Sequence, residues 1–405
     1  MKNKAAIHTS DFKTLVKSNI RNYSMFIVLV VIMLIFAYLT KGVNFNPRNF
    51  TNIFFQNSYV LILAVGMVMI IITQNIDLSV GSACAFIGML SATIYNTGIG
   101  MPATIIASIF IGVLIGAYQG SWVAFGKMPA FIVTLSGMLL FRGLTYGFSL
   151  LRTGGVSPVS LKDTNYSLFA KGILDEVLGI EKRIGPYFPM AFVVAIFLLA
   201  VFFIAEFVGR RRKIANEFEV APLPLFITKL VLISLLVLGL ADRFARYRGL
   251  PIVVLVLGVT IFAFHFILNN TVLGRHIYAV GGNPRSAKLS GINSEMITFI
   301  VFCFMGGLTG LASVAHTGDM GTALPQAGNL FELDAIAACY IGGVSAGGGI
   351  GTVIGVIVGG LVMATINNGM ILMNLGAHYQ YIVKALVLVL AVFYDVYNRR
   401  KAGLG

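Results

Sequence analysis

A few ionisable and amide side chains interrupt the long apolar stretches of this sequence, and their chemistry needs explaining first. A charged group near the centre of a lipid bilayer costs about 2.5–3.5 kcal/mol or more, so a chain keeps one there for a pathway, a gate or a paired structural site. The candidates for a translocation path or gate are Asp77, Ser79, Arg142, Asp334, Asn367 and Asn368.

The acidic candidates also have a structural interpretation. Asp77 and Ser79 lie just before an apolar stretch, where either side chain can accept the free N–H groups at the start of a helix. Asn329 and Glu332 have the spacing of a loose capping arrangement ahead of Asp334. We favour capping for these residues and keep a path or gating role as the alternative.

The basic and amide candidates allow two interpretations as well. Arg142 and Lys384 lie inside apolar runs, where each can extend its charge to the membrane interface or pair with a carboxylate. Asn367 and Asn368 lie deep in another apolar run, where an amide without a partner is expensive. Hydroxyl groups of a polar substrate are natural partners for such amides, and hydrogen bonds between helices suit them equally well.

Other kinds of chemistry have no support in the sequence. The nearest Gly-Lys pair, Gly126-Lys127, is followed by Met128 and is not part of a G-x-x-x-x-G-K-[ST] motif, so the chain does not hydrolyse ATP through a P-loop. The cysteines lack the spacing of metal ligands. We expect a chain that is not an enzyme, with no catalytic residue, no metal site and no bound cofactor.

Long apolar helices must position these residues. Hydrophobic residues make up 58% of the chain and charged residues 11%, whereas a soluble domain carries about 25% charged residues. The pattern predicts an all-α polytopic transmembrane helical bundle with about twelve membrane segments, forming a single domain over residues 1–405. The segments are 25–40, 54–73, 80–97, 102–124, 130–150, 188–208, 223–241, 250–268, 296–316, 333–346, 350–373 and 378–397.

The segment 333–346 is too short to cross a bilayer, and it runs into the glycine-rich stretch 342–349. It is expected to be a broken or re-entrant helix. Such a helix is tolerated at membrane depth only where protein or a water-filled cavity surrounds it. The segment is therefore the best indication of a substrate path that the residues themselves give.

Small residues recur at four-residue spacing, which lets helix backbones approach closely within a membrane. We favour packing inside one bundle as their role, and a contact between subunits remains the alternative for one of these stripes. They are Gly112-x3-Gly116-x3-Gly120, Gly143-x3-Gly147, Gly306-x3-Gly310 and Gly351-x3-Gly355-x3-Gly359.

The net charge of +14 reflects membrane topology, because the basic residues gather at the ends of apolar segments as the positive-inside rule expects. We expect no nucleic-acid partner and place both termini in the cytoplasm. Arg243, Arg246 and Arg248 oppose this assignment because they would face outward. The residues that favour it are Lys2, Lys4, Lys13, Lys17, Arg21, Lys127, Arg210–Lys213, Arg275, Arg285, Lys288, Arg399, Arg400 and Lys401.

Two long hydrophilic segments remain, an outer loop over 151–187 and an inner, turn-rich stretch over 269–295. Within the inner stretch, Pro284 can begin a helix and Gly291 can end it. A rigid helix of about two turns at the membrane surface suits the transmission of force from a soluble partner. The alternative is an ordinary amphipathic surface helix.

Residues 273–293 closely resemble the cytoplasmic coupling loop of the ribose/xylose/arabinose/galactose branch of bacterial ABC sugar permeases, whose pattern is LGR-x-IYA-x-GGN-x2-A-x-LSGIN. The resemblance extends over most of the chain, through 76–82, 129–135, 141–143, 332–338, 367–369 and 379–385. It implies coupling to an ATPase through Gly281, Gly282, Asn283, Pro284, Arg285, Ala287, Lys288, Leu289, Ser290 and Gly291.

An extra helix pair over 188–241 distinguishes this chain from the shorter, ribose-type members. The insertion is similar to that of the xylose and multiple-monosaccharide permeases. It disfavours ribose and leaves xylose, arabinose, galactose and glucose open.

The resemblance also implies the partners and the location. The chain would be a permease homodimer in the lipid of the bacterial plasma (inner) membrane, crossing it several times. A cytoplasmic ATP-binding subunit would carry ATP and Mg²⁺, and a periplasmic or lipid-anchored sugar-binding protein would deliver the substrate.

The main alternative is an ion-coupled secondary sugar transporter, a class that also favours this number of spans. Residues 240–246 partly match an inter-helix motif of that class, but Leu238 and Ala245 stand where the motif has glycine. Ion coupling would also require several titratable groups inside the membrane, and few occur here. A membrane scaffold, the third class, leaves the shaped inner loop unexplained.

Overall fold

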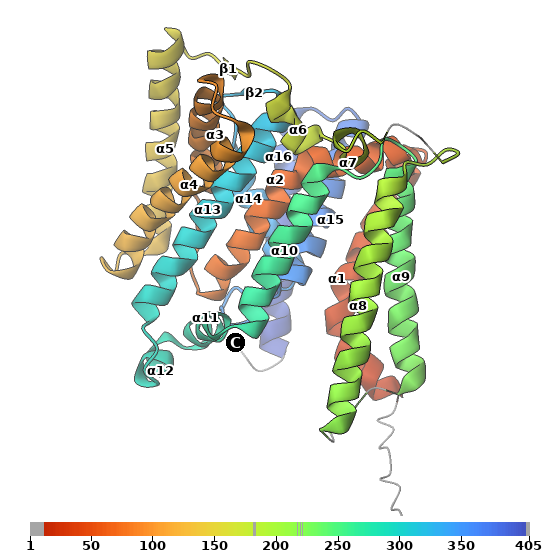
Figure 1. The fold of residues 1–405 in the computed structure, drawn as a ribbon. Coiled ribbons are helices and arrows are strands. Elements are labelled where there is room, and N and C mark those ends of the chain that lie inside the picture. Colours follow the sequence, from red (N-terminus) through yellow and green to blue (C-terminus); the bar gives the residue numbers. More distant parts are fainter. Residues whose placement is uncertain (1–11, 181–183, 217, 219, 221, 402–405) are drawn as a thin grey trace, which may run out of the picture. The chain divides into compact units, whose positions relative to one another are not determined.

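The chain forms a bundle of long apolar helices. The computed structural model describes residues 12–180, 184–216, 218, 220 and 222–401, which form sixteen α-helices, a short 3₁₀ turn and a two-stranded ribbon (Figure 1). The prediction of an all-α polytopic bundle is confirmed. Lys2 and Lys4, which belong to the predicted N-terminal charge, lie outside the described residues.

Each predicted membrane segment corresponds to one helix. Within the described chain, eight helices are long and apolar enough to cross a membrane, and shorter apolar helices accompany them at Met25–Leu39, Val80–Asn96 and Ala377–Phe393. The helices are α1 (Phe12–Leu39), α2 (Pro47–Ile72), α3 (Val80–Asn96), α4 (Met101–Ala124), α5 (Ala130–Thr153), α8 (Pro189–Ala215), α9 (Leu223–Ala245), α10 (Ile252–Asn270), α13 (Ser294–Met320), α14 (Phe331–Ile341), α15 (Val353–Leu372) and α16 (Ala377–Lys401).

The remaining elements are short. The loop over 151–187, which the sequence predicts to lie outside, contains β1 (Val159–Ser160), α6 (Asn165–Lys171) and α7 (Leu174–Val177). Strand β1 pairs antiparallel with β2 (Thr322–Ala323), in the register Val159 opposite Ala323. The predicted inner stretch holds α11 (Val272–Gly282) and α12 (Pro284–Leu289), and the 3₁₀ turn is η1 (Val43–Phe45).

Helix α14 is short, as expected from the sequence. It has 11 residues, and at about 1.5 Å per residue it reaches roughly half of the ~30 Å hydrocarbon layer. It ends at Ile341, earlier than the predicted 346, because Gly343 adopts the left-handed conformation with φ +82°. A glycine-rich loop over 342–352 then leads to α15.

The chain divides into two compact units, and the smaller one comprises residues 1–27 and 173–250. Its helices α8 and α9 pack against each other and correspond to the predicted extra pair. Asp175 is fully buried beside them, where its carboxylate accepts the Met190 N–H at 3.1 Å. Gly249, with φ +108°, lets the backbone approach that carboxylate closely.

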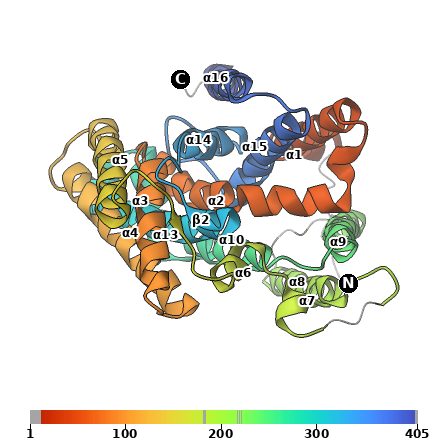
Figure 2. The same ribbon diagram turned by 90° about the horizontal axis from the view of Figure 1, so that it is seen from above.

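The larger unit comprises residues 28–172 and 251–405, and α2 forms its centre. In α2, 89% of the apolar stretch that is long enough to cross a membrane is buried inside the protein, whereas in α4 only 22% is buried. Helix α2 therefore faces other helices on nearly all sides. Figure 2 shows α14 and α15 on one side of α2, and α10 and α13 on the other. Every candidate path residue lies in this unit.

Close packing of α4 on α13 depends on glycine. A Cβ atom at Gly112 would overlap the carbonyl oxygen of Gly306, and one at Gly116 would overlap that of Phe302. In the described chain, no heavy atom lies within 4 Å of the corresponding position at Gly143 or Gly147. The α4 stripe therefore packs inside the bundle, as expected from its spacing.

Gly116→Ala is expected to destabilise the subunit by about 1–3 kcal/mol, because the added methyl group forces two helix backbones apart. Gly147→Ala is the matched control and should leave stability unchanged, since its methyl group enters open space. Thermal unfolding of the two variants in detergent makes the comparison. Equal midpoints for both would contradict the packing assignment.

Candidate functional site

The segment matched to the coupling loop is mostly helical rather than turn-rich. Helix α11, which the sequence did not lead us to expect, begins where the Thr271 hydroxyl accepts the Gly274 N–H at 3.2 Å. Its buried residues Gly274, Ile277 and Val280 recur every third position and form one face. This spacing is the signal that could have predicted the helix.

Helix α12 lies where the sequence predicts a short helix, and both ends are capped. Asn283 accepts the Ser286 N–H at 3.0 Å, and Pro284 occupies the first position. At the other end, Gly291 has φ +84°, and Ile292 N–H donates to the Ala287 carbonyl at 3.0 Å. This is the Schellman pattern, which satisfies carbonyls that lack helical partners.

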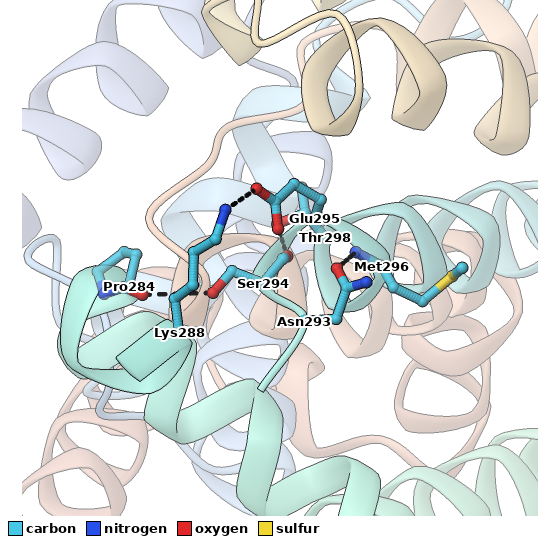
Figure 3. A network of polar contacts seen from close by, with 7 residues as sticks. All are labelled: Pro284, Lys288, Asn293, Ser294, Glu295, Met296 and Thr298. Carbon is cyan, nitrogen blue, oxygen red and sulfur yellow. Dashed lines mark hydrogen bonds and ion pairs between the residues drawn. The ribbon is translucent and has the colours of Figure 1, made fainter. Parts of the chain in front are cut away.

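Side chains around α12 fix it to the start of α13 (Figure 3). The Lys288 ammonium group lies 2.8 Å from Glu295 Oε1, and the Ser294 hydroxyl donates to the Pro284 carbonyl at 3.3 Å. Ala287 is the one buried residue of α12, whereas the Leu289 side chain is 90% exposed. The helix is thus a small rigid element that presents an apolar side chain outward.

Asp77 and Ser79 form one polar cluster with Gln119 of α4. Asp77 Oδ1 accepts the Ser79 N–H at 2.9 Å and the Ser79 hydroxyl at 2.7 Å. Gln119 Nε2 donates to that hydroxyl at 2.6 Å. Asp77 therefore closes a turn just before α3, and the helix start itself has no side-chain cap. The capping interpretation favoured for Asp77 and Ser79 is wrong in this detail.

Asp334 and Asn367 form a second buried cluster with Lys384 of α16. The Lys384 ammonium group lies 2.7 Å from Asp334 Oδ2, and Asn367 Nδ2 donates to the same oxygen at 3.4 Å. Asn367 Nδ2 is also 3.5 Å from Asn57 Oδ1 of α2. Asp334 is completely buried. The cluster joins α2, α14, α15 and α16, and it offers acceptors and an ammonium donor together.

Arg142 and Asn368 make other contacts. Arg142 donates to the carbonyls of Pro325 and Ala327 at 3.1 and 2.7 Å, so it fixes the loop before α14 through backbone groups rather than through an ion pair. Asn368 exchanges two amide hydrogen bonds with Asn49 of α2, at 2.8 and 3.0 Å. Neighbouring residues on a helix point about 100° apart, which separates Asn368 from Asn367.

Several residues of these clusters were not among the sequence candidates. Gln119, Asn57 and Asn49 are buried amides within apolar helices. Their position as amides inside apolar runs of the sequence is the signal that could have singled them out. The sequence indicated that Lys384 could pair with a carboxylate, but it did not identify Asp334 as that partner.

Metal chemistry has no support in the described residues, where no group of three or more His, Cys, Asp or Glu side chains could hold an ion. The cysteines there are free, and Cys84 and Cys339 are buried.

Comparisons with known proteins place the chain among transport permeases. It matches the family model described as "Branched-chain amino acid transport system / permease component" over residues 49–392. It is 39% identical over 384 residues to the xylose transport system permease protein XylH of Haemophilus influenzae, which covers 95% of this chain and 98% of that protein.

Two further relatives come from Escherichia coli K12. XylH is 38% identical over 406 residues, 98% of each chain. The ribose import permease protein RbsC is 34% identical over 370 residues, 91% of this chain and 92% of that protein. No solved structure matches the chain.

Proposed function

Because the chain belongs to the family of permease components of branched-chain amino acid transport systems, we propose that it is the membrane-spanning subunit of an ATP-binding-cassette importer that carries xylose. The XylH relatives align over nearly their full length, at higher identity than the ribose permease. The additional helix pair α8 and α9 is consistent with the same choice, because the resemblance associates such a pair with the xylose and multiple-monosaccharide permeases.

The observation that carries the ATP-driven mechanism is helix α12. It is capped at both ends, tied to α13 and exposed on its outer surface, so a push on it moves α13 instead of bending a loop. The partner ATPase, which would bind ATP and Mg²⁺, would grip Leu289 as an apolar anchor with Arg285 at the rim. Buried anchors ringed by polar contacts are typical of protein interfaces.

The two polar clusters are proposed to line the path or form its gate. Both lie in the bundle that holds α14, the short helix, and their hydroxyl, amide and ammonium groups match the donors and acceptors of a sugar. Ion coupling fits the second cluster poorly, because a coupling cation at Asp334 would meet the Lys384 ammonium group already bound there. The secondary-transporter alternative therefore gains no support from this site.

The wider assembly follows from the same proposal. Two copies of the chain would pair in the bacterial inner membrane with both termini in the cytoplasm, and the loop over 151–187 would receive a sugar-binding protein outside. Two arginines that oppose this topology have local partners, since Arg246 contacts Asp242 and Arg248 contacts Glu176, each at 2.8 Å. These ion pairs give both arginines a structural role on the outer side.

Xylose uptake by cells that lack their own xylose transport tests the proposal. Cells that express this chain with its ATPase and binding protein should accumulate labelled xylose, and excess unlabelled ribose should compete poorly. Uptake that ribose suppresses as well as xylose does would contradict the assigned substrate.

Leu289→Asp is expected to reduce ATP-driven uptake at least about tenfold, equivalent to ~1.4 kcal/mol, because a carboxylate cannot enter an apolar pocket of the ATPase. The variant should insert and fold normally, since Leu289 is 90% exposed. Leu289→Met, which keeps the apolar character, is the control and should retain uptake. Normal uptake by Leu289→Asp at equal protein levels would count against the gripping role.

A further inference from the structure

Three backbone segments that are distant in sequence meet next to the start of α12, which we call the coupling helix. They are the turn after α2 over 72–77, the end of α11 over 278–282, and the glycine-rich loop over 342–352. Gly349 N–H donates to the Ile72 carbonyl at 2.9 Å, and the Tyr278 hydroxyl donates to the Gly351 carbonyl at 2.7 Å. We call this meeting point the glycine junction.

Gln74 is the side chain that links the turn after α2 directly to both other segments of the glycine junction. Its Nε2 donates to the Gly281 carbonyl at 2.8 Å and to the Gly347 carbonyl at 2.9 Å. The Gly281 carbonyl is among the last four of α11, which have no partner within the helix. The side-chain amide of Gln74 therefore donates to carbonyls of two of the segments, and its own backbone belongs to the third, the turn after α2.

The backbone of Gln74 is unusual in a way that supports a specific role. Its φ of +61° lies in the left-handed region, which side chains other than glycine seldom adopt. Such a conformation persists only where the surroundings enforce it, and it often marks a functional position. Here Gln74 occupies the left-handed position that ends α2, where its N–H donates to the Ile71 carbonyl and the Asn75 N–H donates to the Ile70 carbonyl, each at 3.0 Å. The two hydrogen bonds from the side chain then tie this turn to α11 and to the glycine-rich loop.

The glycine junction connects the coupling helix to both polar clusters. Helix α12 begins at Pro284, just after the Gly281 carbonyl that Gln74 holds. The turn that contains Gln74 continues directly into Asp77 and Ser79. The loop over 342–352 joins α14, which carries Asp334, to α15, which carries Asn367. A displacement of α11 and α12 therefore has a covalent and hydrogen-bonded route to each cluster, which is short to Asp77 and runs along α14 to Asp334.

We propose that Gln74 is a positioning residue that transmits the movement of α12 to the Asp77 and Asp334 clusters at the same time. The inference rests on the proposed function. It adds the residue that transmits the ATP-driven movement of α12 to the proposed translocation path. Without the amide of Gln74, α11 loses its direct hydrogen bond to the turn over 72–77, and the remaining link runs through Tyr278 and the loop over 342–352. Movement of α12 then reaches the turn less completely. More ATP is then hydrolysed for each sugar imported.

The test uses the complete transporter, with its ATPase and binding protein, in proteoliposomes. The quantity measured is the xylose imported per ATP hydrolysed. Gln74→Met keeps the length of the side chain and removes both donors, and Gln74→Glu replaces the donors with acceptors that the carbonyls repel. Each should lower the ratio at least about tenfold, ~1.4 kcal/mol of lost coupling, while hydrolysis stays near its original rate.

Two further variants separate coupling from structure. Gln74→Lys restores donors of similar reach and should keep most of the ratio. Gln380→Met is the matched control, because Gln380 Nε2 donates only to the nearby Leu375 carbonyl at 3.2 Å, and it should change nothing.

Three results would overturn the inference: an unchanged ratio in Gln74→Met, a parallel loss of hydrolysis and import, or equal damage in Gln74→Lys. Failure of the proposed function itself would show differently. In that case the original chain would import xylose without ATP.

Discussion

Replacing Gly281 with alanine is expected to abolish transport and to lower the thermal stability of the subunit, whereas Gly282→Ala does not lower the stability. A Cβ atom at Gly281 would overlap the carbonyl oxygen of Ile72 and would lie 2.8 Å from the backbone nitrogen of Gly349. Both neighbours are backbone atoms, so no flexible side chain can move aside. Overpacking of this kind costs about 1–3 kcal/mol and occasionally more, and we expect the upper end here.

Gly282, the next residue, is a close control for the Gly281→Ala substitution. In the described chain nothing lies within 4 Å of a Cβ atom at Gly282, although the two residues share the same helix end and the same sequence environment. Thermal unfolding in detergent should separate the two variants, and xylose uptake measures the loss of transport in Gly281→Ala. If Gly281→Ala melted like Gly282→Ala, the close contact between α11 and the turn after α2 would not exist in the working protein.

Lys384→Met is expected to destabilise the subunit by about 3–5 kcal/mol, because it leaves the Asp334 carboxylate buried without its partner. Asp334 is completely buried and the Lys384 side chain is 15% exposed, so water cannot replace the lost ammonium group. Arg248→Met is the control for stability. It breaks an ion pair with Glu176 whose side chains are 42% and 45% exposed, and such a surface pair contributes about 0–1 kcal/mol.

A double variant separates the structural role of this pair from its role in transport. Asp334→Leu combined with Lys384→Met leaves no unpaired charge, so the double variant should be more stable than Lys384→Met alone. It should still transport poorly if the pair lines or gates the path. Thermal unfolding and uptake of the same preparations measure both effects. Full transport by the stable double variant would remove the pair from the proposed path.

The sequence predicts the helices well because each depends on local information. Apolar length alone locates the membrane segments, and the short α14 is evident from where its apolar run gives way to glycine. The ends of α12 follow from Pro284 at the first position and Gly291 at the left-handed position. Helix α11 was missed because two of its four buried residues are glycine, so its apolar face stands out weakly in hydropathy.

The contacts of the site could not be predicted in the same way, because they join residues far apart in the chain. Asn49 and Asn368 pair across 319 positions, and Gln74 reaches residues more than 200 positions away. Arg142 was expected to extend to the membrane interface or to pair with a carboxylate, and it donates instead to two backbone carbonyls. Asp77 was expected to cap a helix, and it closes a turn instead. A single sequence identifies polar residues within apolar helices, and the three-dimensional packing decides how they pair.

The most direct test supplies the assembled transporter in proteoliposomes with one energy source at a time. We expect labelled xylose to accumulate when ATP and Mg²⁺ are present on the side that α12 faces, with no ion gradient imposed. Accumulation driven by a proton or sodium gradient in the absence of nucleotide would contradict the account.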